Sequence, residues 1–198
     1  MKKILKFSLV LVVALTTMNV HAVSVVDFSL EVKKQQGKMV TFAINKINNI
    51  DLSIYDANDK LIYSEKVNSK KNFNRTYDLR EFPEGTYFLV AESDTKISRY
   101  EISVVGKTAA LSANPISEVY KPTFENKKGL VWVSLLNRDK TPVNIKIYDE
   151  ANNEVYDSDV MLDQNVKKVF DINNINDKEY TFMMTYKDKT YMKTFVSN

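Results

Sequence analysis

Apolar and polar residues alternate over several short segments of this chain. In residues 50–55, Ile-Asp-Leu-Ser-Ile-Tyr, every second residue is apolar until the turn begins. A period of two predicts a β-strand with one buried face. Residues 56–60, Asp-Ala-Asn-Asp-Lys, follow as a turn, because Asx side chains can hydrogen-bond their own backbone. Residues 61–67 then return as the partner strand, so the pattern predicts a β-hairpin.

Similar segments surround this hairpin. They are rich in β-branched and aromatic residues, are bounded by turn signals, and lie at residues 25–32, 39–44, 73–79, 86–91 and 96–105. They lack the 3.6-residue period of an amphipathic helix. Seven short strands with frequent turns predict an antiparallel β-sandwich of the immunoglobulin-like or fibronectin-III-like kind.

The hairpin pattern occurs twice. Ile54-Tyr-Asp-Ala-Asn-Asp-Lys-Leu-Ile-Tyr63 recurs as Ile147-Tyr-Asp-Glu-Ala-Asn-Asn-Glu-Val-Tyr156, and the register holds as far as Tyr87 and Tyr180. The matches fall on predicted core positions: Leu52 with Ile145, Ile54 with Ile147, Ile62 with Val155, Val67 with Val160, Leu79 with Ile172, and Phe82 with Ile175. The chain is therefore expected to be all-β, with tandem sandwiches at 23–107 and 116–198. The small and polar residues 108–115 are expected to be an inter-domain linker.

The first 22 residues have the pattern of a signal peptide. Lys2, Lys3 and Lys6 precede a nine-residue apolar run, residues 7–15, which is too short to cross a bilayer. Val-His-Ala at 20–22 fits the small-x-small cleavage rule, so cleavage is expected after Ala22. The protein is then exported, to the periplasm, cell surface or medium, without a membrane span. An uncleaved anchor is the alternative.

The composition excludes several kinds of function. The chain has 28 Lys+Arg and 25 Asp+Glu, and its excess of lysine lies in the leader, so the exported part is neutral. A neutral chain without a basic stripe does not suit nucleic acid. The only histidine, His21, is in the leader, and there is no cysteine. Catalytic Ser-His-Asp and Cys-His groups and zinc sites built on His or Cys are thereby excluded.

A turn before residue 87 resembles a tyrosine corner. Pro83 presets the first turn residue, Gly85 frees the last, and Tyr87 follows Pro83 by four positions. In such corners a buried tyrosine hydrogen-bonds the backbone across the turn. The second repeat keeps the tyrosine, Tyr180, with Asn176 and Lys178 in place of the proline and glycine.

Three motifs together resemble a known family. Ile54-Tyr-Asp-x-x-x-x-Leu-Ile-Tyr63, Tyr77-Asp-Leu79 and Pro83-x-Gly-Thr-Tyr-Phe-Leu89 are similar to the small C-terminal β-sandwich that sorts cargo to the type IX secretion system of Bacteroidetes. The chain departs from that pattern where Asp59 and Asn152 replace the hairpin glycine. The given residues are also expected to form only two such modules, without a cargo domain. The resemblance implies a sandwich fold and an exported bacterial protein more than an export signal.

The hairpin tyrosines are the candidate binding residues. If Ile54 and Ile62 face the core, alternation places Tyr55 and Tyr63 together on the outer face, and Tyr148 and Tyr156 repeat this. Such pairs could stack on sugar rings or anchor a partner protein. Alternatively they are cross-strand pairs that stabilise the sheet.

Other candidates have simpler explanations. The Asx clusters at 56–59, 149–153 and 171–177 could bind calcium, but they lack the glycine and distal glutamate of a calcium loop and suit ordinary turns. Trp132, alone in a strand pattern, is expected in the core, and a role in binding is the alternative. No pair of acids stands out as a glycosidase pair, so no enzyme activity, metal or cofactor is expected.

The expected function is therefore that of a secreted or cell-envelope protein that binds or supports a protein or glycan partner without catalysis. A carbohydrate-binding module that uses the tyrosines is one alternative, and a secretion-sorting or adhesion module is another. Edge strands could also accept a partner's strand.

Overall fold

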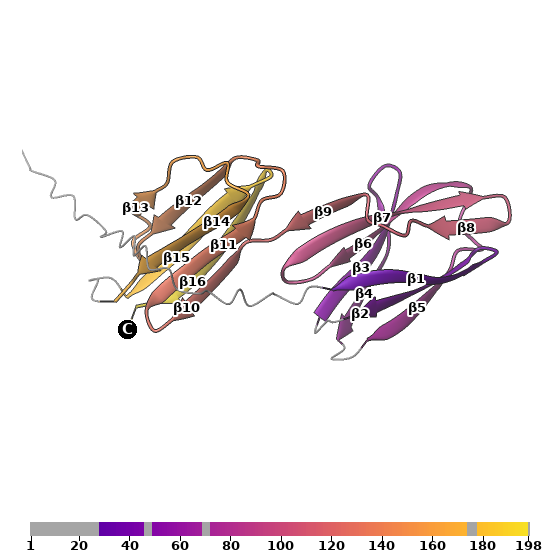
Figure 1. The fold of residues 1–198 in the computed structure, drawn as a ribbon, viewed down its shortest axis with the longest axis horizontal. Coiled ribbons are helices and arrows are strands. Elements are labelled where there is room, and N and C mark those ends of the chain that lie inside the picture. Colours follow the sequence, from indigo (N-terminus) through magenta and orange to yellow (C-terminus); the bar gives the residue numbers. More distant parts are fainter. Residues whose placement is uncertain (1–27, 46–48, 69–71, 174–177, 198) are drawn as a thin grey trace, which may run out of the picture. The chain divides into compact units, whose positions relative to one another are not determined.

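The computed structural model describes residues 28–45, 49–68, 72–173 and 178–197 (Figure 1). Within these residues the chain forms β-strands and no helix, so the predicted all-β fold class is confirmed. In the same residues no helix has the length and apolarity needed to cross a membrane. The predicted signal peptide, residues 1–22, lies outside the described residues.

The strands divide into two compact units, with the boundary between Lys121 and Pro122. The strands of the first unit are β1 (Ser29–Gln36), β2 (Met39–Asn45), β3 (Asn49–Asp56), β4 (Leu61–Asn68), β5 (Phe73–Asp78), β6 (Gly85–Glu92), β7 (Lys96–Val105), β8 (Thr108–Leu111) and β9 (Ser117–Tyr120). Those of the second unit are β10 (Thr123–Lys127), β11 (Leu130–Leu136), β12 (Val143–Tyr148), β13 (Glu154–Asp157), β14 (Asn165–Asp171), β15 (Glu179–Tyr186) and β16 (Lys189–Val196).

Both units are antiparallel β-sandwiches with the same plan. In the first, a sheet of order β1-β2-β5 faces a sheet of order β4-β3-β6-β7-β8, and β9 also pairs with β7. In the second, the corresponding sheets are β10-β11-β14 and β13-β12-β15-β16. The repeat detected in the sequence therefore corresponds to equivalent strands, and Tyr87 opposite Ile102 matches Tyr180 opposite Phe195.

Each sandwich closes over side chains that alternate along the strands. In β3, Ile50, Leu52 and Ile54 are buried, and the residues between them are partly exposed. Phe42, Leu89 and other apolar residues complete this core from β2, β6 and β7. In the second unit Phe182 is fully buried, and its ring contacts those of Phe170 at 5.5 Å and Phe195 at 5.8 Å. The hydrophobic effect of these alternating faces explains why the segments pack as sheets.

The expected linker is in fact a strand of the first sheet. β8 pairs antiparallel with the second half of β7, opposite residues 102–105, and Ala109 and Leu111 are buried in the first core. The prediction of a linker at 108–115 was wrong because its small residues suggested a polar spacer. Buried and exposed residues in fact alternate along this strand, so it has one buried face.

The second sandwich also begins later than predicted. Residues 116–120 fall within the range predicted for it, 116–198, but β9 pairs with the first half of β7, opposite residues 96–99. The backbone bonds from Ser112 N to Glu101 O and from Ile116 N to Arg99 O, each 2.8 Å, join β8 and β9 along β7. The predicted boundaries of 23–107 and 116–198 are corrected to a division after Lys121.

Candidate functional site

The tyrosines of the first hairpin do not share a face. Tyr63 lies opposite Ile54, whereas Tyr55 lies opposite Leu61, so Ile62 is the extra residue of a β-bulge. Directly opposite residues point to the same side of a sheet. Tyr63 therefore lies on the core side with Ile54, and Tyr55 lies on the outer side, opposite Phe88 of β6. The predicted common outer face was wrong because the bulge shifts the alternation by one position.

The second hairpin repeats this bulge. Tyr156 lies opposite Ile147, Tyr148 lies opposite Glu154, and Val155 is the extra residue. The ring of Tyr156 packs edge-on against Phe170, with centroids 5.1 Å apart, and its burial raises the pKa of the Tyr156 hydroxyl.

Two consequences follow for the hairpin predictions. The bulged residues are not core residues: Ile62 is 44% exposed and Val155 is 40% exposed, and Val160, also expected in the core, is 63% exposed. Tyr55 with Tyr63, and Tyr148 with Tyr156, cannot form the paired platform on which the carbohydrate alternative depended. Binding by a single one of these tyrosines stays a prediction.

The hairpin carboxylates are occupied by the turns themselves. Asp56 Oδ1 accepts the backbone N–H groups of Asn58 at 2.8 Å and Lys60 at 3.0 Å. Asp149 Oδ1 accepts those of Ala151 at 2.9 Å and Asn153 at 2.8 Å. These are Asx turns, in which the side chain replaces a backbone acceptor.

The third Asx cluster lies only partly in the described residues. Asp171 accepts the backbone N–H of Asn173 at 2.8 Å, and residues 174–177 lie outside the described part of the chain. In the part that is described, no three His, Cys, Asp or Glu side chains are grouped as metal ligands.

The corner before β6 has the expected hydrogen bond. The hydroxyl of Tyr87 donates to the carbonyl of Pro83 at 2.9 Å, and the rings of Phe82 and Tyr87 meet edge to face at 5.0 Å. Gly85 has φ +152°, a conformation that side chains disfavour. Tyr180 is buried at the equivalent place in the second unit. The bond between Tyr87 and Pro83 thus fixes the entry of the chain into β6, which is a structural role.

An apolar cavity opens where the two sheets of the first unit end. β4 and β5 are the end strands of the two facing sheets. Between them lies a cavity of about 360 Å³, which we call the edge cleft, lined by Ile54, Ile62, Tyr63, Thr76, Tyr77, Asp78, Leu79 and Phe82. Its size is at the lower end of the range for ligand pockets. Because both bordering strands are end strands, an extended segment could lie along either of them.

A polar network supports one wall of the edge cleft. The hydroxyl of Tyr77 donates to Glu65 at 2.9 Å, and Arg75 Nε donates to the same carboxylate at 3.1 Å. Tyr77 also contacts the rings of Phe42 at 5.3 Å and Tyr63 at 5.7 Å. Burial, together with the bond to Glu65, raises the pKa of Tyr77 well above its usual value. Tyr77 is therefore held by these contacts, and its hydroxyl is uncharged near neutral pH.

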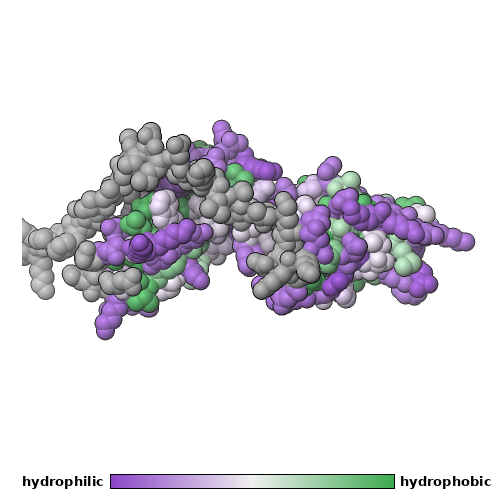
Figure 2. Space-filling model, turned by 60° about the horizontal axis from the view of Figure 1, so that its bottom comes forward, coloured by the Kyte–Doolittle hydropathy of each residue, from purple (hydrophilic) through white to green (hydrophobic). Residues whose placement is uncertain are grey.

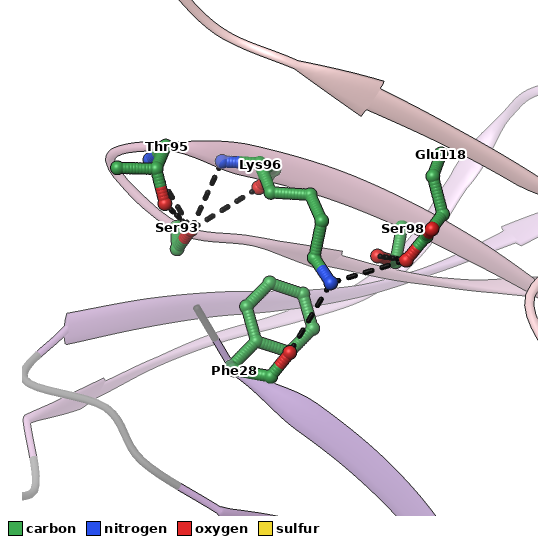
Figure 3. Close-up of polar contacts among 6 residues, drawn as sticks. All are labelled: Phe28, Ser93, Thr95, Lys96, Ser98 and Glu118. Atoms are coloured by element: carbon green, nitrogen blue, oxygen red, sulfur yellow. Dashed lines mark hydrogen bonds and ion pairs between the residues drawn. The ribbon is translucent and has the colours of Figure 1, made fainter. Parts of the chain in front are cut away.

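Figure 3 shows a second polar cluster of the first unit, which the sequence did not reveal. Lys96 is only 7% exposed, and its ammonium donates to Glu118 at 3.1 Å and to the carbonyl of Phe28 at 3.2 Å. Ser98 donates to the same carboxylate at 3.2 Å. Glu118 belongs to β9, which had been expected in the other sandwich, so no sequence pattern linked it to Lys96.

Trp132 is the remaining correction. It was expected in the core but is 44% exposed on the outer side of β11, between Glu125 of β10 and Val169 of β14. The core side of β11 is occupied by Val131, Val133 and Leu135 instead.

In the view of Figure 2, hydrophilic residues dominate the surface and hydrophobic residues form smaller patches.

Comparison with known proteins agrees with the resemblance of the first repeat. Residues 36–104 match the family described as the secretion system C-terminal sorting domain. This range contains the hairpin, the corner and the whole lining of the edge cleft. No curated protein matches the sequence.

Several solved structures share a weak likeness. A biofilm-associated protein BSP domain is 12% identical with a TM-score of 0.26, and the match covers 84% of this chain but only 29% of that one. Escherichia coli alpha-2-macroglobulin, domains NIE-MG1, is 10% identical with a TM-score of 0.26, covering 85% and 97%. The FN1-FN3 domains of chicken CNTN1 are 8% identical with a TM-score of 0.27, covering 84% and 64%. Likenesses this weak carry no functional argument.

Proposed function

We propose that the first unit, whose residues 36–104 match the secretion system C-terminal sorting family, is a sorting or surface-attachment module of an exported, non-catalytic bacterial protein. The family match is the observation that carries the proposal. The leader pattern at residues 1–22 supports export as well, because a substrate of such a system must first leave the cytoplasm.

We place the recognition surface at the edge cleft. The cleft lies within the matched residues, it is mostly apolar, and two end strands border it. A partner protein of the envelope would insert an apolar side chain into the cleft and lay its extended backbone along β4 or β5. Asp78, the one carboxylate of the lining, is held ionised by Arg80, which lowers its pKa. The cleft thus suits docking rather than proton transfer.

A pair of reporter fusions tests the sorting role. Residues 23–121 or residues 122–198 are fused behind a reporter with its own signal peptide and expressed in a type IX-competent Bacteroidetes host. We expect the fusion with 23–121 to reach the surface or medium, and to stay in the periplasm when the secretion system is deleted. Periplasmic retention in the competent host, or equal export of the fusion with 122–198, would contradict the proposal.

A matched pair of substitutions tests the edge cleft. Ile62 lines the cleft and is 44% exposed, whereas its neighbour Leu61 is 51% exposed and is not among the lining residues. Ile62→Lys is therefore expected to reduce export of the fusion severalfold, and Leu61→Lys is expected to leave it unchanged. Equal effects of the two changes would remove the cleft from the recognition surface without affecting the sorting assignment.

A further inference from the structure

The two units differ at one edge although their strands correspond. β7 of the first unit and β16 of the second occupy the same place, because each pairs with the strand that bears the corner tyrosine. On the side away from β6, β7 pairs with β8 and β9 along most of its length. Within the described residues β16 is the end strand of its sheet, and none of their strands takes the place beside it that β8 and β9 take beside β7.

The difference in burial follows this difference in pairing. The core-side residues of β7, Ser98, Tyr100 and Ile102, are all buried. The equivalent residues of β16, Tyr191, Lys193 and Phe195, are half-buried or exposed. On the outer side of β16, Met192 and Val196 are each 63% exposed. The second sheet therefore ends in a strand that still exposes apolar and aromatic surface.

A lysine marks the same position on both strands. Lys96 lies at the start of β7 and Lys189 lies at the start of β16. Each lysine precedes the residue that pairs with the corner tyrosine, Ile102 or Phe195, by the same number of positions. In the first unit, the covering strand β9 brings Glu118 to the ammonium of Lys96. Lys189 is exposed, and no ion pair to it is formed among the described residues. Among the residues that the structure describes, the second unit thus has the equivalent lysine but no strand that supplies an acid to it.

We propose that β16 is a docking edge that accepts an antiparallel strand from a different polypeptide. That strand takes the place that β8 and β9 take in the first unit. Its residue opposite Phe195 is apolar, as Leu111 is opposite Ile102. Its residue opposite Tyr191 is a carboxylate that reaches Lys189, as Glu118 opposite Ser98 reaches Lys96. The backbone groups of β16 provide its affinity, and the carboxylate sets its register. This proposal concerns the second unit and does not depend on sorting by the first.

Charge argues against β16 of a second copy as the occupant. The strand has the sequence Lys-Thr-Tyr-Met-Lys-Thr-Phe-Val, with two lysines and no acid. Pairing two such strands would gather like charges on one edge, which disfavours association. The Lys96–Glu118 pair of the first unit shows the complementary arrangement. An acidic strand is therefore the favoured partner.

The chain itself provides a probe strand. A fluorescent peptide of residues 107–121, which contains β8, β9 and Glu118, is titrated against the full chain without its leader, and binding is followed by anisotropy. We expect saturable binding of one peptide per chain. Lys189→Glu is expected to weaken this binding by about tenfold or more, because attraction becomes repulsion. A peptide with Glu118→Lys should then bind the Lys189→Glu chain and fail to bind the unchanged one.

A matched control separates the docking edge from general electrostatics. Lys167 lies on β14 in the other sheet of the same unit and is exposed, so Lys167→Glu makes the same charge change away from β16. It should leave peptide binding unaltered. The proposal is overturned if the peptide does not bind, if Lys189→Glu binds it as well as the unchanged chain does, or if sedimentation shows that β16 instead joins two copies of the chain.

Discussion

Replacing Glu118 by alanine is expected to destabilise the first unit. The carboxylate of Glu118 accepts the ammonium of Lys96 at 3.1 Å and the hydroxyl of Ser98 at 3.2 Å. The Lys96 side chain is 9% exposed and that of Glu118 is 22% exposed. The substitution leaves a buried cation without its counter-charge and a buried hydroxyl without its acceptor, and both losses disfavour the folded state.

The structure gives the size of the effect. Two charges 3.1 Å apart attract by about 5 kcal/mol at an effective dielectric of 20. Breaking a buried pair costs about 3 to 5 kcal/mol. Lys96 keeps the carbonyl of Phe28 at 3.2 Å and its ring at 4.6 Å, which compensates in part. A loss of about 3 kcal/mol is therefore expected, near the lower end of that range.

Urea unfolding can assign this loss to one unit. Trp132 is the only tryptophan and lies in the second unit, so its fluorescence reports that unit, while far-UV circular dichroism reports both. The part of the dichroism change that does not coincide with the fluorescence change reports the first unit. With Glu118→Ala, its midpoint should move to lower urea by about 1 to 3 M. The Trp132 transition should stay in place.

Two further variants control this experiment. Glu125→Ala removes an exposed acid of β10 that pairs with Lys127, and should change stability by less than about 0.5 kcal/mol. Combining Lys96→Met with Glu118→Ala should restore most of the lost stability, because an apolar side chain can replace a buried pair. A shift of the Trp132 transition in Glu118→Ala, or no shift of either transition, would refute the assignment of β9 to the first core.

The remaining predictions concern two tyrosines of the first unit. Tyr87→Phe removes the 2.9 Å bond to the Pro83 carbonyl and should lower the free energy of unfolding by about 1 kcal/mol, measured by urea titration with Tyr55→Phe as the control. The pKa of Tyr77 is raised in the folded state, so its stabilising contribution is complete below the unfolded value near 10 and is lost as the pH rises above it. The urea concentration at the unfolding midpoint should therefore decrease as the pH rises from about 9 to 11. Tyr77→Phe should make this decrease smaller, and an unchanged profile would contradict the burial of Tyr77.

Much of the fold could be predicted because alternation is a local property. Ile50, Leu52 and Ile54 alternate with polar neighbours, and burying one face of each such segment leaves a two-sheet sandwich as the solution. The duplication was visible for the same reason, since equal core positions recur at equal spacing. Tyr87 followed Pro83 at the spacing of a corner, and the backbone bond is indeed formed.

Pairing between strands could not be predicted in the same way. A bulge at Ile62 reverses the face of Tyr63, although the sequence on either side still alternates. Whether a strand contains such an extra residue depends on the register of its neighbour. The edge cleft that Tyr63 helps to line was therefore hidden from the sequence.

The sequence by itself determined that this chain is all-β, duplicated and built on two alternating cores, because those features depend on residue type and spacing. Only the tertiary structure decided where the first unit ends, since residues 108–120 have little hydrophobic pattern and are held by the free edge of β7. It likewise decided that Lys96 forms an ion pair with Glu118 of β9. No strand of the described residues lies in the equivalent place beside Lys189. These outcomes depend on which edges meet in space, and the order of residues along a chain does not contain that information.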